Sequence, residues 1–209
     1  MNIFFISDLH LFHENMLRGG KIAIRPFDTI HEMHERIVDG WNSVVKPGDK
    51  VYMQGDLTLM RPKTKLAGVT DFFSFEPFKA PGQWLALCGV VNQLQGEKRI
   101  LLGNHDHMTA EMYHALGFEK VLAYREMAGI LFSHIPVHTS QFYRFRGNVH
   151  GHTHEAKVMR VPSWGPDPKP GDWNVLPDPR YINVCAEPRN YVPMSLDEIV
   201  AHYDKLEKW

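Results

Sequence analysis

The chain has few cysteines, no long apolar run and almost no net charge. Each of these features excludes or disfavours a class of protein. Its 209 residues include only two cysteines, Cys88 and Cys185, which favour buried free thiols over a disulfide framework. No apolar run reaches the roughly 18 residues that a membrane-spanning helix needs. A formal net charge of −1 gives no whole-chain attraction to nucleic acid or to a membrane.

From the sequence we expect neither a targeting segment nor a linker that divides the chain into domains. The N-terminus starts Met-Asn-Ile-Phe-Phe-Ile, with no basic region or cleavage site, so it favours a first strand over a signal peptide. Without repeats or a dividing linker, the sequence predicts one cytoplasmic domain over residues 1–209. Residues 61–83 and 161–180 are rich in proline and aromatic side chains, and we expect both to be long ordered loops or insertions.

Short apolar runs alternate with amphipathic stretches, which is typical of α/β proteins. Strands are expected at residues 2–7, 50–54 and 98–102, as two strands within 119–134 joined near Ala128-Gly129, and as one ending near Val149. Helices are expected at residues 30–45, 84–94 and 109–116 and after Ser195. Capping boxes are expected at Thr29 with Glu32 and at Ser195 with Glu198.

The 13 histidines are the unusual feature of the composition, because histidine is the commonest metal ligand. Potential ligands occur in five groups, each at the end of a predicted strand, where side chains can converge on one crevice. The groups are Asp8-Leu-His10, Gly55-Asp56, Gly103-Asn104-His105-Asp106, Ser133-His134 and Gly151-His152-Thr-His154. Carboxylate, amide and imidazole ligands suit Mn, Fe, Zn or Ni better than Ca or Mg. The glycines before Asp56, Asn104 and His152 would let the backbone turn sharply and approach the metals closely.

This order of motifs resembles the calcineurin-like metallophosphoesterases. Further segments are similar to the small single-domain members of bacteria and phages, so the resemblance covers nearly the whole chain. These segments are Arg25-Pro26-Phe27, Trp41-Asn42, Val51-Tyr52 and Pro193-Met-Ser-Leu-Asp-Glu198. The resemblance implies an α/β fold of two facing mixed β-sheets flanked by helices, a four-layer αββα sandwich.

The resemblance also implies two divalent metal ions per chain, with manganese favoured and iron, zinc or nickel as alternatives. The implied ligands form two sets joined by one bridging residue, Asp56. The first set is Asp8, His10 and His154, and the second is Asn104, His134 and His152. His105 would face the leaving group as general acid.

Two divalent ions held by Asp8 and Asp56 would give a nearly neutral protein a positively charged site. Such a site favours the binding of negatively charged phosphate esters. Such ions can activate a water as hydroxide and clamp the phosphoryl oxygens during attack. Phosphoprotein phosphatases follow Gly-Asp with Asp-Arg-Gly, whereas this chain continues Leu57-Thr58-Leu59. This departure, together with the family resemblance, favours a small phosphodiester of nucleotide type as the substrate, in preference to a monoester.

Three further polar residues each have two open roles. Asp106 either orients His105 or caps the following helix. His13 either contacts the substrate and supports the site or is a solvated loop histidine. Arg25 either grips a phosphate through its fork or forms a surface salt bridge.

The remaining histidines and phenylalanines favour plain structural roles. His150 is expected to be a hydrogen-bonded strand histidine. The helical histidines are expected on solvated faces, and these are His31, His34 and His114. The phenylalanines of residues 72–78 favour a packed flap or a homodimer contact over a base-stacking platform.

Two other function classes stay open. A nuclease of this family would usually carry a basic surface or extra domains, so nucleic acid is a possible but less favoured partner. A non-catalytic binding module tends to lose catalytic residues, whereas His105 and all seven implied ligands are present here. No membrane partner is expected.

Overall fold

The computed structural model describes residues 1–22, 24–63, 76–80, 82–160 and 175–206. Most of the two predicted loops, at residues 61–83 and 161–180, lies outside the described residues. The expected roles of Phe72, Phe73 and Phe75 therefore stay predictions. Phe78 is described, and its buried ring lies beside Trp84 at 6.2 Å between centroids.

A five-stranded sheet forms the first half of the fold, with the strand order β11-β1-β2-β3-β4. Four of its strands are parallel, and the edge strand β11 is antiparallel to β1. The bounds are β1 Ile3–Ile6, β2 Lys50–Met53, β3 Glu97–Leu101, β4 Phe118–Leu122 and β11 Met194–Ser195. The parallel strands bring their carboxyl ends to one edge, as expected for strands joined through helices.

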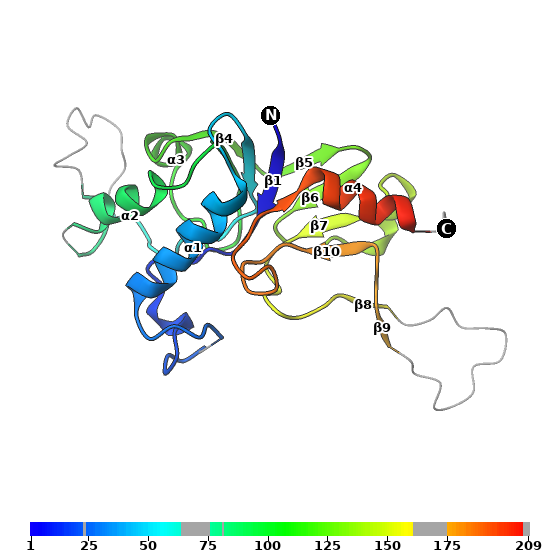
Figure 1. The fold of residues 1–209 in the computed structure, drawn as a ribbon. Helices are drawn as coiled ribbons and strands as arrows, with labels where there is room; N and C mark the ends of the chain where they lie inside the picture. Colours follow the sequence, from blue (N-terminus) through cyan, green and yellow to red (C-terminus); the bar gives the residue numbers. More distant parts are fainter. Residues whose placement is uncertain (23, 64–75, 81, 161–174, 207–209) are drawn as a thin grey trace.

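Three helices cover one face of this sheet and bury their apolar sides against it (Figure 1). They are α1 Ile30–Val44, α2 Gln83–Val91 and α3 Ala110–Ala115. The predicted capping box of Thr29 and Glu32 is confirmed at the start of α1. Met33, Ile37 and Trp41 lie on one side of that helix and are fully buried, as their helical spacing predicts.

A four-stranded mixed sheet packs on the opposite face, with the order β10-β7-β6-β5. Its strands are β5 Tyr124–Met127, β6 Ile130–Ser133, β7 Asn148–His150 and β10 Tyr181–Asn183. Phe5 of the first sheet stacks on Phe132 of the second, with ring centroids 4.2 Å apart. Helix α4, Leu196–Lys205, adds Ile199 and Tyr203 to this shared core and starts at the predicted capping box.

Short elements complete the described chain. They are the 3-10 helices η1 Glu14–Met16 and η2 Thr139–Tyr143 and the two-stranded pair β8 Met159–Arg160 and β9 Leu176–Pro177. No helix among the described residues is long and apolar enough to cross a membrane. Both cysteines are free, but only Cys185 is buried, so the expectation of two buried thiols is wrong for Cys88.

The predicted pair of strands within residues 119–134 is three strands. β4 ends at Leu122 in the first sheet and β5 begins at Tyr124 in the second, so only Ala123 separates the two sheets here. Periodicity alone does not show that a continuous extended stretch changes sheet. The turn at Ala128-Gly129 is confirmed, and both residues have the positive φ that a tight hairpin between β5 and β6 requires.

Gly40 in α1 tests how closely this helix packs against the loop that follows β10. A Cβ at Gly40 would overlap the backbone carbonyl of Tyr191. We expect Gly40→Ala to lower the free energy of unfolding by about 1 to 2 kcal/mol, because overpacking outweighs the gain in helix propensity of about 1 kcal/mol. Gly89→Ala in α2 is the control, since a Cβ there meets nothing within 4 Å and should stabilise the protein. Chemical denaturation measures both, and equal shifts would contradict the close packing.

Candidate metal centre

All five predicted ligand groups lie at the carboxyl ends of strands, in the segments after β1, β2, β3, β6 and β7. The two sheets together bring their polar side chains into two clusters. Each cluster contains three potential ligand atoms within 4.8 Å of one another. The clusters are Asp8, His10 and His154, and Asp56, His134 and His152. The arrangement is compatible with two metal ions.

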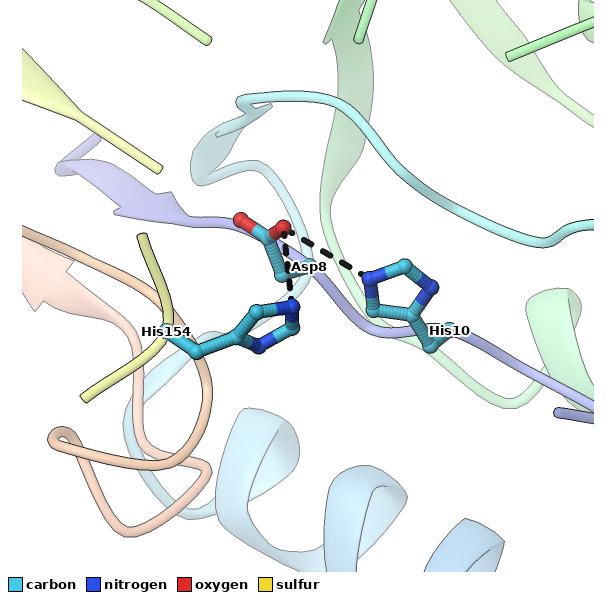
Figure 2. A group of neighbouring side chains, drawn as sticks. All are labelled: Asp8, His10 and His154. Atoms are coloured by element: carbon cyan, nitrogen blue, oxygen red, sulfur yellow. Dashed lines mark ion pairs between the residues drawn. The ribbon is translucent and has the colours of Figure 1, made fainter. Parts of the chain in front are cut away.

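The first cluster is centred on one carboxylate oxygen of Asp8, and Figure 2 shows both histidines directed at it. Asp8 Oδ1 lies 3.6 Å from His10 Nε2 and 4.0 Å from His154 Nε2. Two ligands of a common ion, each about 2.1 Å from it, lie roughly 3 to 4 Å apart. Asp8 Oδ1 and His10 Nε2 are buried and have no hydrogen-bond partner among the described residues. Because buried polar atoms are rarely left unpaired, these atoms fit a bound cation.

At the second cluster, the side chain of Asn104 joins those of His134 and Asp56, so three acceptors meet there. His134 Nδ1 lies 2.8 Å from the backbone oxygen of Gln54, which can only accept, so Nδ1 carries the proton. In the neutral ring Nε2 then presents a lone pair. That lone pair faces Asn104 Oδ1 at 2.9 Å and Asp56 Oδ2 at 3.5 Å. Three electron-rich atoms at such distances repel one another unless a cation lies between them, so this cluster also fits a metal ion.

Asp56 belongs to the second cluster and also faces the first. Its Oδ2 is 3.7 Å from His10 Nε2 and 3.5 Å from His134 Nε2. Its Oδ1 accepts a hydrogen bond of 2.9 Å from the backbone N–H of His105. This position suits the predicted bridging role, which stays a prediction.

The backbone is strained at most of the predicted ligands. Five of them adopt the left-handed conformation, with φ between 47° and 67°. They are Asp8, His10, Asp56, His152 and His154. Left-handed residues other than glycine cost about 1–3 kcal/mol each and cluster at functional sites. The fold therefore holds these side chains in place against a local conformational preference.

Glycine allows the loops to approach one another. Gly55 has a φ of +89°, which favours glycine, and it starts the turn into Asp56. Gly103 and Gly151 do not have a positive φ, but a Cβ would overlap Asp56 Oδ1 at the first and Ser7 Oγ at the second. The close approach at these two glycines is thus between neighbouring loops, whereas the sequence pattern predicted approach to metals.

The charge of Asp8 is strongly held in this setting. Burial alone would raise its pKa, but the neighbouring His10 and His134 and the hydroxyl of Ser7 lower the pKa well below its ordinary value. Asp8 Oδ2 also accepts hydrogen bonds from the backbone N–H of His152 at 2.8 Å and from Cys185 Sγ at 3.2 Å. One oxygen of Asp8 is thus fixed by the protein, and the other is left for a cation.

His105 and His13 both lie beside the first cluster. The half-buried ring of His105 is 5.8 Å from the ring of His10, between centroids, and the ring of His13 is 5.5 Å from it. Burial, then the neighbouring His10 and Arg25, lower the pKa of His13 to about 4. His13 is thus a half-buried, neutral histidine close to the cluster and not a fully solvated loop histidine.

Asp106 does not cap the following helix, and its predicted orienting of His105 stays a prediction. Its carboxylate accepts hydrogen bonds from the backbone N–H groups of Gly103, Asp56 and Leu57 and from the hydroxyl of Tyr113. The cap of α3 is Thr109, and the described contacts of Asp106 include none to the His105 ring. Asp106 therefore fastens the loop after β3 to the loop after β2, which fixes Asp56 and Asn104 relative to each other.

Arg25 is not at the surface and is not free to grip a phosphate. It is buried and forms an ion pair with Glu187 at 2.6 Å. Its Nη1 donates to the backbone oxygen of Leu9 at 2.7 Å, and its Nη2 donates to that of Asp8 at 2.6 Å. With its guanidinium used in this way, Arg25 supports the segment after β1 and is not assigned to the substrate.

Glu187 and Cys185 are site residues that the sequence pattern did not single out. They contact His154 and Asp8, respectively. Both residues follow the run Tyr181-Ile182-Asn183-Val184, which contains β10. They therefore lie just after the carboxyl end of a strand, as the five predicted ligand groups do. That apolar run is the signal in the sequence, and the proline-rich stretch beside it obscures the strand pattern.

The four histidines that the sequence assigns to structural roles divide into two groups. His150 is buried, with Nδ1 2.8 Å from the oxygen of Gly151, which confirms a hydrogen-bonded strand histidine. His31 and His114 lie on exposed helix faces, as expected. His34 does not: it is buried, and its Nε2 accepts a hydrogen bond of 3.1 Å from the backbone N–H of Phe12, between His10 and His13.

His34 predicts a pH dependence of stability. Burial first, then His31 and Arg25, lower its pKa to about 4 in the folded protein, from 6.5. The unfolded chain thus binds more protons between these values, so the stabilisation is complete above pH 6.5 and is lost as the pH falls toward 4. After allowance for solvent screening, we expect a loss of about 1 to 2 kcal/mol. His34→Gln keeps a side-chain acceptor without this titration, so its unfolding free energy should fall less across the same interval. Parallel curves for the two proteins would contradict the assignment.

Comparison with known proteins gives a relative along nearly the whole chain and a solved structure with a similar fold. The chain is 30% identical over 204 residues to the uncharacterized protein MJ1445 of Methanocaldococcus jannaschii, covering 97% of this chain and 92% of that protein. It superposes on the protein of unknown function AQ665 from Aquifex aeolicus with a TM-score of 0.61 and 22% identity, over 96% and 98% of the two chains. This likeness shows the fold alone.

A partial superposition on the Pseudomonas putida nuclease MPE is weaker, with a TM-score of 0.42 and 12% identity, over 73% of this chain and 61% of that one. A likeness this low does not establish a shared fold or activity. No family model matches the chain.

Proposed function

The chain belongs to one family with the archaeal protein MJ1445, and we propose that it is a two-metal phosphoesterase acting on small phosphodiesters. The observation that carries the proposal is the pair of acceptor clusters, with Asp56 of the second also facing His10 of the first and with His105 beside the first. The ligand chemistry, the burial of unpaired acceptors and the strained backbone all support a site built for cations. The order of the motifs supports a calcineurin-like centre and its four-layer sandwich.

Two bound divalent ions would activate a water and neutralise charge on the phosphoryl oxygens. The chain's own residues would then do the remaining work. Asp8 holds negative charge where the first ion would bind, and Asp106 keeps the loops after β2 and β3 in register. His105, half-buried beside the first cluster, donates a proton to the departing oxygen.

The preference for small substrates and diesters rests on composition and sequence pattern. The chain has 23 basic and 24 acidic residues, which provides no net attraction for a polymer of phosphates. The absence of Asp-Arg-Gly after Asp56 disfavours a phosphoprotein phosphatase. We propose manganese as the native metal, with iron, zinc or nickel as alternatives. A nuclease is the second candidate, and salt-dependent binding of DNA or RNA by the pure protein would favour it.

A hydrolysis screen tests the proposal directly. Protein loaded with manganese, nickel or zinc is offered cyclic nucleotides, dinucleotides, generic phosphodiesters and monoesters. We expect turnover that requires added metal and is faster on diesters. Metal binding without turnover on any phosphoester would support a binding module and contradict the proposal.

Metal stoichiometry tests the role of Asp56. We expect two divalent ions per chain in the wild type. Asp56→Asn should weaken both sites together, each by at least about tenfold, because its carboxylate oxygen lies close to ligands of both clusters. Equilibrium dialysis with metal analysis measures both affinities. Retention of one ion at wild-type affinity would contradict the bridge.

His105→Ala separates proton donation from metal binding. The variant should keep both ions, because His105 belongs to neither cluster. An alkoxide leaving group needs a proton in the transition state, so kcat/KM for natural-type esters should fall by about 10²- to 10⁴-fold. Nitrophenyl esters have a far better leaving group and should lose distinctly less. Equal losses on both ester types, with the ions retained, would show that His105 positions substrate or stabilises charge and is not the acid.

A further inference from the structure

Behind the first cluster lies a buried ion pair that the proposed chemistry does not use. The side chains of Arg25 and Glu187 are 0% and 3% exposed, and Nε and Nη2 of Arg25 both donate to Glu187 Oε1, at 2.8 and 2.6 Å. Glu187 Oε2 is buried without a hydrogen-bond partner among the described residues. Burying an ion pair is costly unless its remaining polar atoms are also used. The pair therefore calls for a further partner of Glu187.

His154 approaches Glu187 at the oxygen that Arg25 already holds, Oε1, so it is a third group at that oxygen, whereas Oε2 keeps no partner among the described residues. The Nδ1 of His154 lies 3.2 Å from Glu187 Oε1, and this nitrogen is also buried without a hydrogen bond among the described residues. The other ring nitrogen, Nε2, is directed at Asp8 Oδ1 (Figure 2). The ring thus lies between the carboxylate of Glu187 and the first metal position. Since a carboxylate only accepts, the contact favours the ring with its proton on Nδ1 and a lone pair on Nε2.

We propose that Glu187 is a positioning residue of the first metal site: it accepts the Nδ1 proton of His154 and so directs the Nε2 lone pair at the ion. The inference rests on the proposed two-metal centre. A carboxylate behind a ligating imidazole fixes the ring orientation and raises the basicity of the ligand.

Arg25 extends this support to the other ligands of the same cluster. It holds Glu187 and also donates to the backbone oxygens of Asp8 and Leu9, directly before His10. One buried unit therefore connects the three ligands of the first cluster. In the second cluster, the ring of His134 is oriented by a neutral backbone oxygen, that of Gln54. Loss of the Glu187 carboxylate should thus weaken the first site and spare the second.

Two backgrounds isolate the sites. His134→Ala removes a ligand of the second cluster and leaves the first to be measured, and His10→Ala does the reverse. Glu187→Gln is added to each, and zinc affinity is measured by calorimetry. We expect a loss of about 10- to 100-fold in the His134→Ala background and little change in the His10→Ala background. Unchanged affinity at the first site, or equal losses at both, would overturn the proposal.

Folding is controlled in the same design. Zinc binding retained in the His10→Ala background shows that Glu187→Gln still folds. Asp178→Asn is the matched control, because buried Asp178 pairs with Arg180 at 2.6 Å and has no described contact with either cluster. It should change neither affinity. If Glu187→Gln fails to fold, the double variant Arg25→Met with Glu187→Leu removes the pair without leaving a buried charge, and the same site-selective loss is expected.

The position of the proton gives a readout that a merely structural role would not move. Nitrogen NMR of the zinc-loaded His134→Ala protein should show a protonated Nδ1 on His154, and Glu187→Gln should shift that signal. Failure of the inference and failure of the proposed function are distinguishable. A wild type that binds no divalent ion contradicts the two-metal function, whereas site-independent effects of Glu187→Gln contradict only the role of Glu187.

Discussion

The two sheets are joined at the end of β1, and the candidate site depends on that junction. The backbone N–H of Ser7 donates to the backbone oxygen of Val184, and its backbone oxygen accepts from the N–H of Ala186, so Ser7 pairs with the segment after β10. The Ser7 hydroxyl donates to the backbone oxygen of Gln54, which follows β2. Asp8 follows at once and binds the loop after β7 through the N–H of His152. Gly151 leaves the room for this contact. The strand end that carries the first ligand is therefore also the point where the two halves of the fold meet.

A site built at such a junction links metal binding to the relative position of the sheets. The first cluster takes Asp8 and His10 from the first sheet and His154 from the second, and Asp56 faces His134 in the same way. Ions that bind only the folded chain stabilise it by mass action. Here they would also connect the two sheets directly, in addition to the apolar core around Phe5 and Phe132.

Much of the site could be predicted because each ligand group follows a strand at a recognisable spacing. Asp8, His10 and Asp56 are placed by local pattern, and parallel strands then bring their ends together. The supporting contacts could not be predicted in this way. Arg25 and Glu187 are 162 residues apart, and His34 reaches Phe12 only because α1 packs against the segment after β1. Asp106 directly follows His105 in the sequence, which suggests a role for it beside that ring. Its carboxylate accepts hydrogen bonds from backbone N–H groups of the loop after β2.

The difference between ligands and supports has a physical reason. A ligand must present a particular atom to an ion, which limits the residue type and leaves a mark in the sequence. A support needs only an acceptor or donor at the right place, and many residue types on many elements can supply one. Left-handed backbone at Asp8, His10 and His154 adds a cost that such supports help to balance. The buried Arg25–Glu187 pair, which holds Asp8 by its carbonyl and His154 by its ring, is placed where that cost arises.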